Sequence, residues 1–235
     1  FASPDLEYGR PESEAYFDQL MTMFRPSEGE SPSASVQAAA DHMAVSALQA
    51  GDTTMFRQFM GDFLYYLAPK SGEESKEGMK YLIDNYISGR SDIWKSQDDS
   101  LKIIGFAQIM GDLLSKAVPG SRIPDLKVPG DLLRHGKKIK TGQFKLSKLR
   151  GGQNVIIFYT EGCNICEAEK RAARDLVDSD KNAKVLMINV DEIMRSNPAL
   201  ASELFDKFDL SSLPYIIETN SKGLIQRRYA TLASK

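Results

Sequence analysis

The sequence predicts two domains of different class, an all-α domain over residues 1–120 and an α/β domain over residues 121–235. At 235 residues the chain is long enough to hold both. Apolar residues recur at helical spacing in the first half, whereas short apolar strands alternate with helical stretches in the second half. Pro and Gly recur over residues 118–129, which is typical of a domain boundary.

Five amphipathic helices are expected in the first half, after a polar lead-in of residues 1–12. The third is the clearest, because Asp52 or Thr53 can cap it and Pro69 stops it. The predicted helices span residues 13–24, 35–49, 53–67, 79–87 and 101–114. Their Met and aromatic residues leave two interpretations open, core packing or a partner-binding groove, and the helical spacing favours packing.

In the second half, a hairpin over residues 138–146 that turns at Thr141-Gly142 is expected to precede an apolar strand over residues 154–159. Pro198 can start a later helix. The remaining elements are expected as helices over residues 168–177 and 198–208 and strands over residues 184–190, 215–219 and 224–229. This order predicts a mixed sheet with helices on its faces.

The two cysteines of the chain, Cys163 and Cys166, lie between the strand over residues 154–159 and the helix that follows. A Cys-x-x-Cys beside a strand-helix unit is typical of a thioredoxin-like redox site. Cys163 is expected at the helix N-terminus, where free N–H groups and the helix dipole favour a nucleophilic thiolate. Cys166, one turn later and more buried, is expected to resolve the mixed disulfide.

This order of elements resembles the thioredoxin fold, and more closely the TlpA/ResA-like branch of bacterial extracytoplasmic thiol-disulfide oxidoreductases. The resemblance is carried by residues 144–151, by residues 158–166 and by Leu213-Pro214. It implies that Pro214 is cis and lies against the cysteines. It also implies a substrate groove at Leu213, Pro214 and Gly162, in which the backbone of Leu213 pairs with an extended substrate segment.

The resemblance implies exchange with protein thiols and disulfides, an upstream electron donor and no cofactor. The helical first half followed by this module also resembles Bacteroidetes envelope lipoproteins with thioredoxin-like domains. That implies a periplasmic or envelope location and allows a lipid anchor upstream of residue 1. The chain begins with Phe1 rather than Met, so a processed or trimmed N-terminus is expected. Since no run of about 18 apolar residues occurs, no membrane span is expected.

Three departures from the family pattern stand out. Gly162 replaces the Trp that precedes the first cysteine in thioredoxins, and Ile157 replaces their buried carboxylate. Only residues 230–235 follow the last predicted strand, so the usual C-terminal helix is expected to be missing. Another element, such as the helical domain, is then expected to cover that face of the sheet.

The direction of electron flow follows from the charges around the motif. Asn164 and Ile165 bring no basic group, and Glu161, Glu167 and Glu169 lie nearby, which disfavours the thiolate. A less stabilised reduced form has a lower potential, so a reductase is favoured. The alternative is a non-catalytic binding protein with a vestigial thioredoxin-like domain. The missing Trp and buried acid favour that alternative, whereas the cysteine pair and Leu213-Pro214 favour the enzyme.

Other kinds of cysteine site fit less well. A structural disulfide or an inert cysteine pair is a poor explanation for two cysteines at the corner between a strand and a helix. Zinc requires two further ligands, and the two histidines, His42 and His135, are expected in different domains, so no metal is expected. Covalent haem requires His after Cys166, where Glu167 stands. No peroxidatic motif is found.

Composition excludes few other classes of protein. With 42% hydrophobic and 26% charged residues the chain is globular rather than disordered. Charge is uneven: residues 1–120 carry 10 Lys and Arg against 18 Asp and Glu, and residues 121–235 carry 20 against 14. This asymmetry can help the halves dock or steer partners, within the limits of salt screening. No basic cluster is interleaved with aromatics, so nucleic acid is not an expected partner.

Overall fold

The computed structural model describes residues 8–27, 31, 33–70, 72–94, 98–149 and 152–233, with the backbone alone for residues 98–100. The chain divides into two compact units, Phe1–Leu114 and Ser115–Lys235. The predicted domain boundary at residue 120 stays a prediction. The first seven residues of the predicted lead-in lie outside the described residues. So do Arg150 and Gly151, which belong to the segment 144–151 that carries part of the family resemblance.

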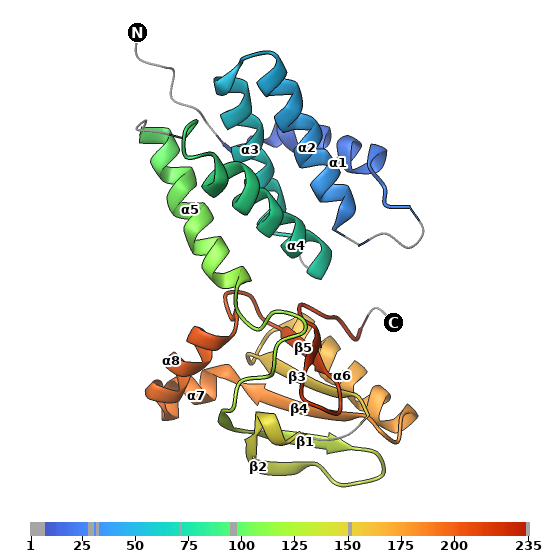
Figure 1. Cartoon of the computed structure of the whole chain (residues 1–235). Helices are drawn as coiled ribbons and strands as arrows, with labels where there is room; N and C mark the ends of the chain where they lie inside the picture. The colour runs from blue at the N-terminus through green and yellow to red at the C-terminus, as the bar shows by residue number, and fades with distance from the viewer. Residues whose placement is uncertain are drawn as a thin grey trace. The chain divides into compact units, whose positions relative to one another are not determined.

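The first unit is helical, which confirms the predicted class (Figure 1). Its α-helices are α1 (Pro11–Met23), α2 (Ala34–Gln49), α3 (Thr53–Leu67), α4 (Glu73–Leu82) and α5 (Asp98–Leu114). A π-helical turn, Ile83–Ile87, and a 3-10 turn, Ser88–Arg90, continue α4. The largest aromatic and Met side chains of the described part are mostly buried in one core, so packing explains most of the apolar stripes.

The start of α1 lies earlier than predicted. Pro11 takes the first helical position, where its missing N–H is not needed. The buried carboxylate of Asp62 in α3 accepts hydrogen bonds from Gly9 N at 2.8 Å and from Ser13 Oγ at 2.9 Å. It also lies 3.2 Å from the guanidinium of Arg10. Asp62 therefore fixes the entry to α1, which a linear pattern does not show.

The second unit is built on a six-stranded sheet of order β2-β1-β4-β3-β5-β6. The strands are β1 (Lys127–Arg134), β2 (Lys140–Lys145), β3 (Asn154–Tyr159), β4 (Lys184–Asn189), β5 (Tyr215–Thr219) and β6 (Ile225–Arg227). β3 and β4 are parallel, and the other neighbours are antiparallel. All six residues of β3 are buried. Burial of one large aliphatic side chain contributes about 1.5–3 kcal/mol, so this strand anchors the sheet.

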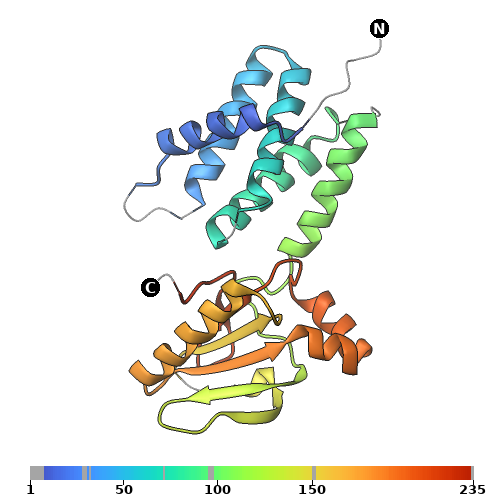
Figure 2. The same cartoon turned by 180° about the vertical axis from the view of Figure 1, so that it is seen from behind.

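Helices cover the two faces of the sheet, as predicted. The helices of this unit are α6 (Asn164–Ser179), α7 (Val190–Ser196) and α8 (Pro198–Lys207). One apolar cluster joins Ile156 and Leu186 to residues of α7 and α8. A second joins Ile157 and Val185 to Cys166 and other residues of α6. Figure 2 shows α6 lying across the strands, with α7 and α8 beyond the end of β4.

The predicted hairpin is wrong in register. Thr141 and Gly142 lie inside β2, where they pair with Asp131 and Gly130 of β1. Pro129-Gly130 suggested a linker, but this part of β1 pairs with β2 and not with β4, so Pro129 interrupts no ladder on the β4 side. Gly130 is required by close approach, because a Cβ there would lie 2.5 Å from the carbonyl oxygen of Met187.

Two further expectations need correction. The strand over residues 184–190 ends at Asn189, whose side chain accepts from Glu192 N and caps the unpredicted helix α7. The sheet face left without a C-terminal helix is covered by the C-terminal segment itself, since Ala230 and Leu232 are buried in the cluster that contains Cys166. No helix of the described residues is both long and apolar enough to cross a membrane.

Candidate functional site

The cysteine pair lies at the corner between β3 and α6. Gly162 has a φ of +72°, in the left-handed region that disfavours side chains, and no atom within 4 Å would meet a Cβ there. Backbone conformation rather than lack of space therefore accounts for glycine at the position that thioredoxins fill with Trp. Gly162 itself is exposed.

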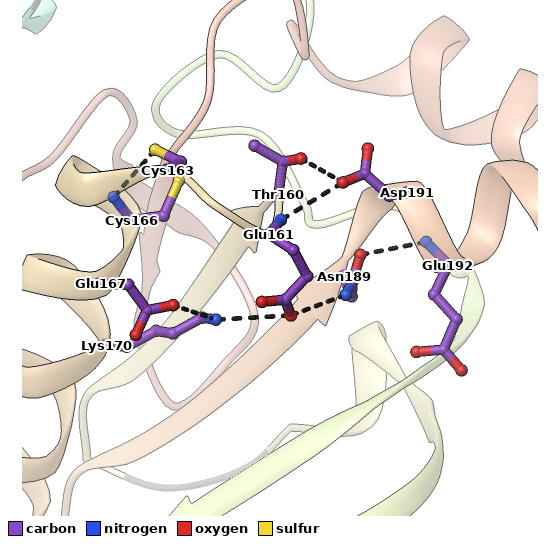
Figure 3. A network of polar contacts seen from close by, with 9 residues as sticks. All are labelled: Thr160, Glu161, Cys163, Cys166, Glu167, Lys170, Asn189, Asp191 and Glu192. Atoms are coloured by element: carbon purple, nitrogen blue, oxygen red, sulfur yellow. Dashed lines mark hydrogen bonds and ion pairs between the residues drawn. The ribbon is translucent and has the colours of Figure 1, made fainter.

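Cys163 is the N-cap residue of α6 and is half-buried. Its Sγ accepts a hydrogen bond from the backbone N–H of Cys166, with an N–S distance of 3.1 Å (Figure 3). Both cysteines are free thiols in this structure. A backbone donor at a helix N-terminus stabilises negative charge on the sulfur that receives it. Cys163 is thus the accessible sulfur of the pair.

Cys166 is completely buried, on the inner face of α6 with Ala173 and Val177. Burial, followed by the hydrogen bond with Cys163, raises the pKa of the Cys166 thiol to about 11. The backbone of Thr160 and the charge of Lys170 oppose this rise. Cys166 therefore keeps its proton in the free dithiol at neutral pH.

Comparison with known proteins supports the fold seen here. Residues 119–235 match the AhpC/TSA family. A solved thioredoxin-like protein from Bacteroides caccae superposes with a TM-score of 0.64 and 14% identity, covering 96% of this chain and 82% of that chain. The C-terminal unit is thioredoxin-like. The superposition with the Bacteroides caccae protein extends across most of the helical unit as well.

A second structure matches weakly. It is the thioredoxin domain of a thiol-disulfide oxidoreductase from Bacteroides vulgatus, with a TM-score of 0.34 and 16% identity. The match covers 50% of this chain and 94% of that domain. No curated protein matches the sequence significantly.

A buried lysine of the thioredoxin-like unit organises the acids near the cysteines. Lys170, whose side chain is 10% exposed, has its Nζ 2.8 Å from Glu167 Oε1 and 3.7 Å from Glu161 Oε1. The same Nζ lies 3.7 Å from the centre of the Tyr159 ring. Burial lowers the pKa of Lys170, but the hydrogen bond to Glu167 and the nearby Tyr159 and Glu161 outweigh burial and raise it overall.

Lys170 changes the electrostatic picture drawn from the sequence. Two of the three glutamates counted against the thiolate share this one cation, so much of their negative charge is compensated. Its hydrogen bond also holds the pKa of Glu167 below the usual value. Sequence reasoning missed Lys170, although its spacing of four residues from Cys166 places both on one face of the helix.

The rest of this polar network ties the end of β3 to the end of β4 (Figure 3). Glu161 accepts from Asn189 Nδ2 at 3.1 Å, and the backbone N–H of Glu161 donates to Asp191 at 3.3 Å. The hydroxyl of Thr160 donates to the same carboxylate of Asp191. These bonds fix the segment that leads into Gly162 and Cys163.

Leu213 and Pro214 precede β5 and are half-buried. The peptide bond between them is cis. Leu213 packs against the same apolar cluster as Cys163, the cluster that contains Cys166. The structure therefore brings the predicted groove residue Leu213 and both cysteines to one cluster.

Glu169 is the buried acid of the α6 face, with 3% of its surface exposed. Its carboxylate accepts from the backbone N–H of Leu232 at 2.7 Å and of Ala233 at 3.2 Å, and from the hydroxyl of Thr231. It thus holds the C-terminal segment on the sheet. The sequence alone left the role of this glutamate open.

No metal centre accompanies the cysteines in the part of the chain that the structure describes, because no group of three or more His, Cys, Asp or Glu side chains there is arranged to hold an ion. His135, one of the two histidines, contacts the backbone carbonyl of Val177 through Nδ1 at 2.9 Å.

Proposed function

We propose that this protein is a thiol-disulfide oxidoreductase that reduces protein disulfides through Cys163 and Cys166. The main observation in support of the proposal is that the two sulfurs differ in accessibility and in protonation. Cys163 is accessible and receives a backbone hydrogen bond at a helix N-terminus, whereas Cys166 is buried and protonated beside it.

In the first step the Cys163 thiolate attacks one sulfur of a partner disulfide. A Cys163–partner mixed disulfide forms, and the second partner sulfur leaves as a thiolate. The Cys166 thiolate then attacks Cys163 Sγ, which forms the Cys163–Cys166 disulfide and releases the other partner thiol. The partner disulfide gains two electrons and two protons, and the dithiol of this protein loses them.

The mixed disulfide also activates Cys166. The hydrogen bond with Cys163 and the negative charge on Cys163 both raise the pKa of Cys166 in the free dithiol. Once Cys163 is bonded to the partner sulfur it carries no negative charge, so the charge effect is removed. Deprotonation of Cys166 then becomes easier at the moment when its attack is needed.

We propose the reducing direction because no cationic residue lies between the two cysteines that would stabilise the reduced form. A buried Cys166 with a pKa of about 11 adds no thiolate stabilisation to the reduced form, and Asn164 and Ile165 bring no cation to Cys163. Among dithiol proteins, a reduced form that is not stabilised goes with a low potential, as in thioredoxin at about −270 mV against about −120 mV for the oxidant DsbA. An upstream electron donor must regenerate the dithiol.

The proposed substrate groove consists of Gly162, Leu213 and Pro214. Exposed Gly162 leaves room above Cys163, and Ile165 adds a side chain that is 66% exposed beside it. The backbone of Leu213 is proposed to pair with an extended segment of the partner protein. These features suit a polypeptide substrate.

We also propose an envelope location, with an upstream lipid anchor, and two separate domains over residues 1–120 and 121–235. Support for the location is the resemblance to the TlpA/ResA-like branch and to Bacteroidetes envelope lipoproteins. Support for the domains is the separate apolar core of each unit.

A redox titration tests the activity. The full chain is equilibrated in dithiothreitol and glutathione buffers, and the Cys163–Cys166 state is read by thiol alkylation and mass spectrometry. A reversible two-electron transition between about −350 and −100 mV is expected, together with reduction of a protein disulfide. Cys163→Ser serves as control and must lose both. Absence of the transition in the intact chain would leave the binding protein with a vestigial thioredoxin-like domain as the better interpretation.

A further inference from the structure

A basic cavity of about 450 Å³ lies over β1, β2 and the start of β4. None of its described lining residues is acidic. Six of them are cations: Lys127, Arg134, Lys140, Lys145, Lys148 and Lys184. The volume is in the range of cavities that hold small molecules.

The basic cavity lies on the sheet face opposite Cys166. Its apolar residues Leu132, Phe144 and Leu149 belong to or pack against the cluster beneath α7 and α8, whereas Cys166 belongs to the cluster beneath α6. No described lining residue comes from α7 or α8, so these helices leave this part of the face open. The cavity is therefore distinct from the cysteine site.

Strand register places like charges opposite each other at the cavity. Arg134 of β1 pairs with Lys184 of β4, on the face that holds Leu132 and Leu186. Lys127 of β1 also pairs with Lys145 of β2, but the alternation of side chains along a strand directs this pair to the other face of the hairpin. Cations directly opposite one another destabilise a sheet. In addition, Nε of Arg134 is buried and has no hydrogen-bond partner among the described residues. An unmade hydrogen bond of this kind is expensive unless a ligand completes it.

The protein supplies little compensating charge. Asp125 lies 2.7 Å from Lys145 Nζ, and hydrogen bonds from Lys145 and Ser147 hold the pKa of Asp125 below its usual value. Within the described ranges, Lys127, Lys140, Lys184 and Arg134 make no ion pair. The sheet thus concentrates positive charge at a concave surface that Asp125 neutralises only in part.

We propose that the basic cavity binds a phosphate-bearing compound with an apolar portion. The Arg134 guanidinium at the cavity wall matches phosphate oxygens in geometry, and the surrounding lysines provide point charges for further phosphate oxygens. The floor of Leu132, Phe144 and Leu149 accommodates the apolar portion. Both a soluble organic phosphate and the headgroup of a phospholipid have this chemistry.

Binding of sodium pyrophosphate to the full chain tests the proposal, by calorimetric titration and by the shift in Tm at physiological ionic strength. We expect saturable binding that is at least 10-fold weaker in the double variant Arg134→Gln/Lys184→Gln. The matched control Lys222→Gln removes an exposed cation from a distant turn and must bind as the wild type does. Without anion, the double variant should melt no lower than the wild type, because the like-charge pair is gone.

Lys140→Gln gives a second readout at an exposed position, with binding expected to weaken about 3-fold. Vesicles of phosphatidylcholine with phosphatidic acid distinguish the sources. Competition by these vesicles, and not by phosphatidylcholine alone, assigns the site to lipid headgroups, and lack of competition assigns it to soluble phosphates. Absence of saturable binding to both probes would overturn the proposal, as would equal affinity of the wild type and the double variant.

Discussion

The two faces of the sheet in the thioredoxin-like unit differ in whether their charged groups are paired. On the α6 face, buried Lys170 is shared by Glu161 and Glu167, and buried Glu169 accepts three hydrogen bonds. On the opposite face, Arg134 and Lys184 lie opposite each other, and the buried Nε of Arg134 has no hydrogen-bond partner among the described residues.

This difference separates two roles for charged groups. Charges that are paired fix geometry and tune neighbouring groups, as Lys170 does for Cys166. Unpaired cations that gather at a concave surface favour the binding of an anion. The charges of the α6 face thus serve the cysteines, whereas those of the basic cavity are the ones proposed to bind an anion.

The largest effect is expected from Cys166→Ser, which tests whether the α6 face is a chemical site. Cys163 can still attack a partner disulfide, but no thiol remains to release it, so the mixed disulfide accumulates. Catalytic turnover should fall at least ~10³-fold. Mass spectrometry of the intact protein detects the adduct. Cys163→Ser is the counterpart and must form none; an adduct of similar yield in both variants would contradict the assignment of roles.

Glu169→Gln tests whether the paired charges of this face are structural. The amide has one acceptor oxygen for three donors, and its NH₂ group faces backbone N–H groups. The free energy of unfolding should fall by about 1–3 kcal/mol, measured by urea denaturation. Exposed Glu203→Gln should change it by less than about 0.5 kcal/mol. Loss of exchange activity without loss of stability would instead make Glu169 a proton-transfer group.

The cysteine corner was predictable because its signals are local. An apolar β-branched and aromatic run predicts β3, and helical periodicity predicts α6, so the position of Cys163 and Cys166 follows from neighbouring residues. The start of α8 at Pro198 was likewise a local signal and is confirmed, and of the two predicted caps of α3, Asp52 and Thr53, the structure has Asp52.

The basic cavity was not predictable because it depends on strand register. Lys127 and Lys145 are far apart in sequence, and only the β1–β2 pairing sets them opposite each other. Because Pro129-Gly130 was interpreted as part of a linker, β1 was not predicted, and the cavity that β1 lines was not predicted either. The excess of positive charge in the second half was the one available signal. Likewise, the contacts of Glu169 with residues 231–233 join segments that no local pattern connects.

The pH dependence of stability sharpens the role of Cys166. Its pKa of about 11 in the folded protein exceeds that of an unfolded cysteine, about 8.5. The stabilisation that the protonated Cys166 thiol gives to the folded protein is therefore complete below about pH 8.5 and is lost as pH rises towards 11. Between these limits the wild type should lose about 1–3 kcal/mol more than Cys166→Ala, measured by urea denaturation. Parallel curves for the two proteins would show that burial does not hold the proton.

The smallest effect is expected from Lys170→Met, which removes the cation that the acids of the α6 face share. Because the charge of Lys170 lowers the pKa of Cys166, its loss should raise that pKa. A higher pKa leaves a smaller thiolate fraction of Cys166, so resolution of the mixed disulfide should be roughly 3-fold slower at pH 8.

The rate profile of the Lys170→Met variant should shift to higher pH, measured by stopped-flow release of the partner thiol, with the first attack by Cys163 little changed. Arg171→Met is the matched control, since Arg171 is the exposed neighbouring cation. An equal shift in both variants would mean that Cys166 responds to the net charge of α6 and not to the buried pairing around Lys170.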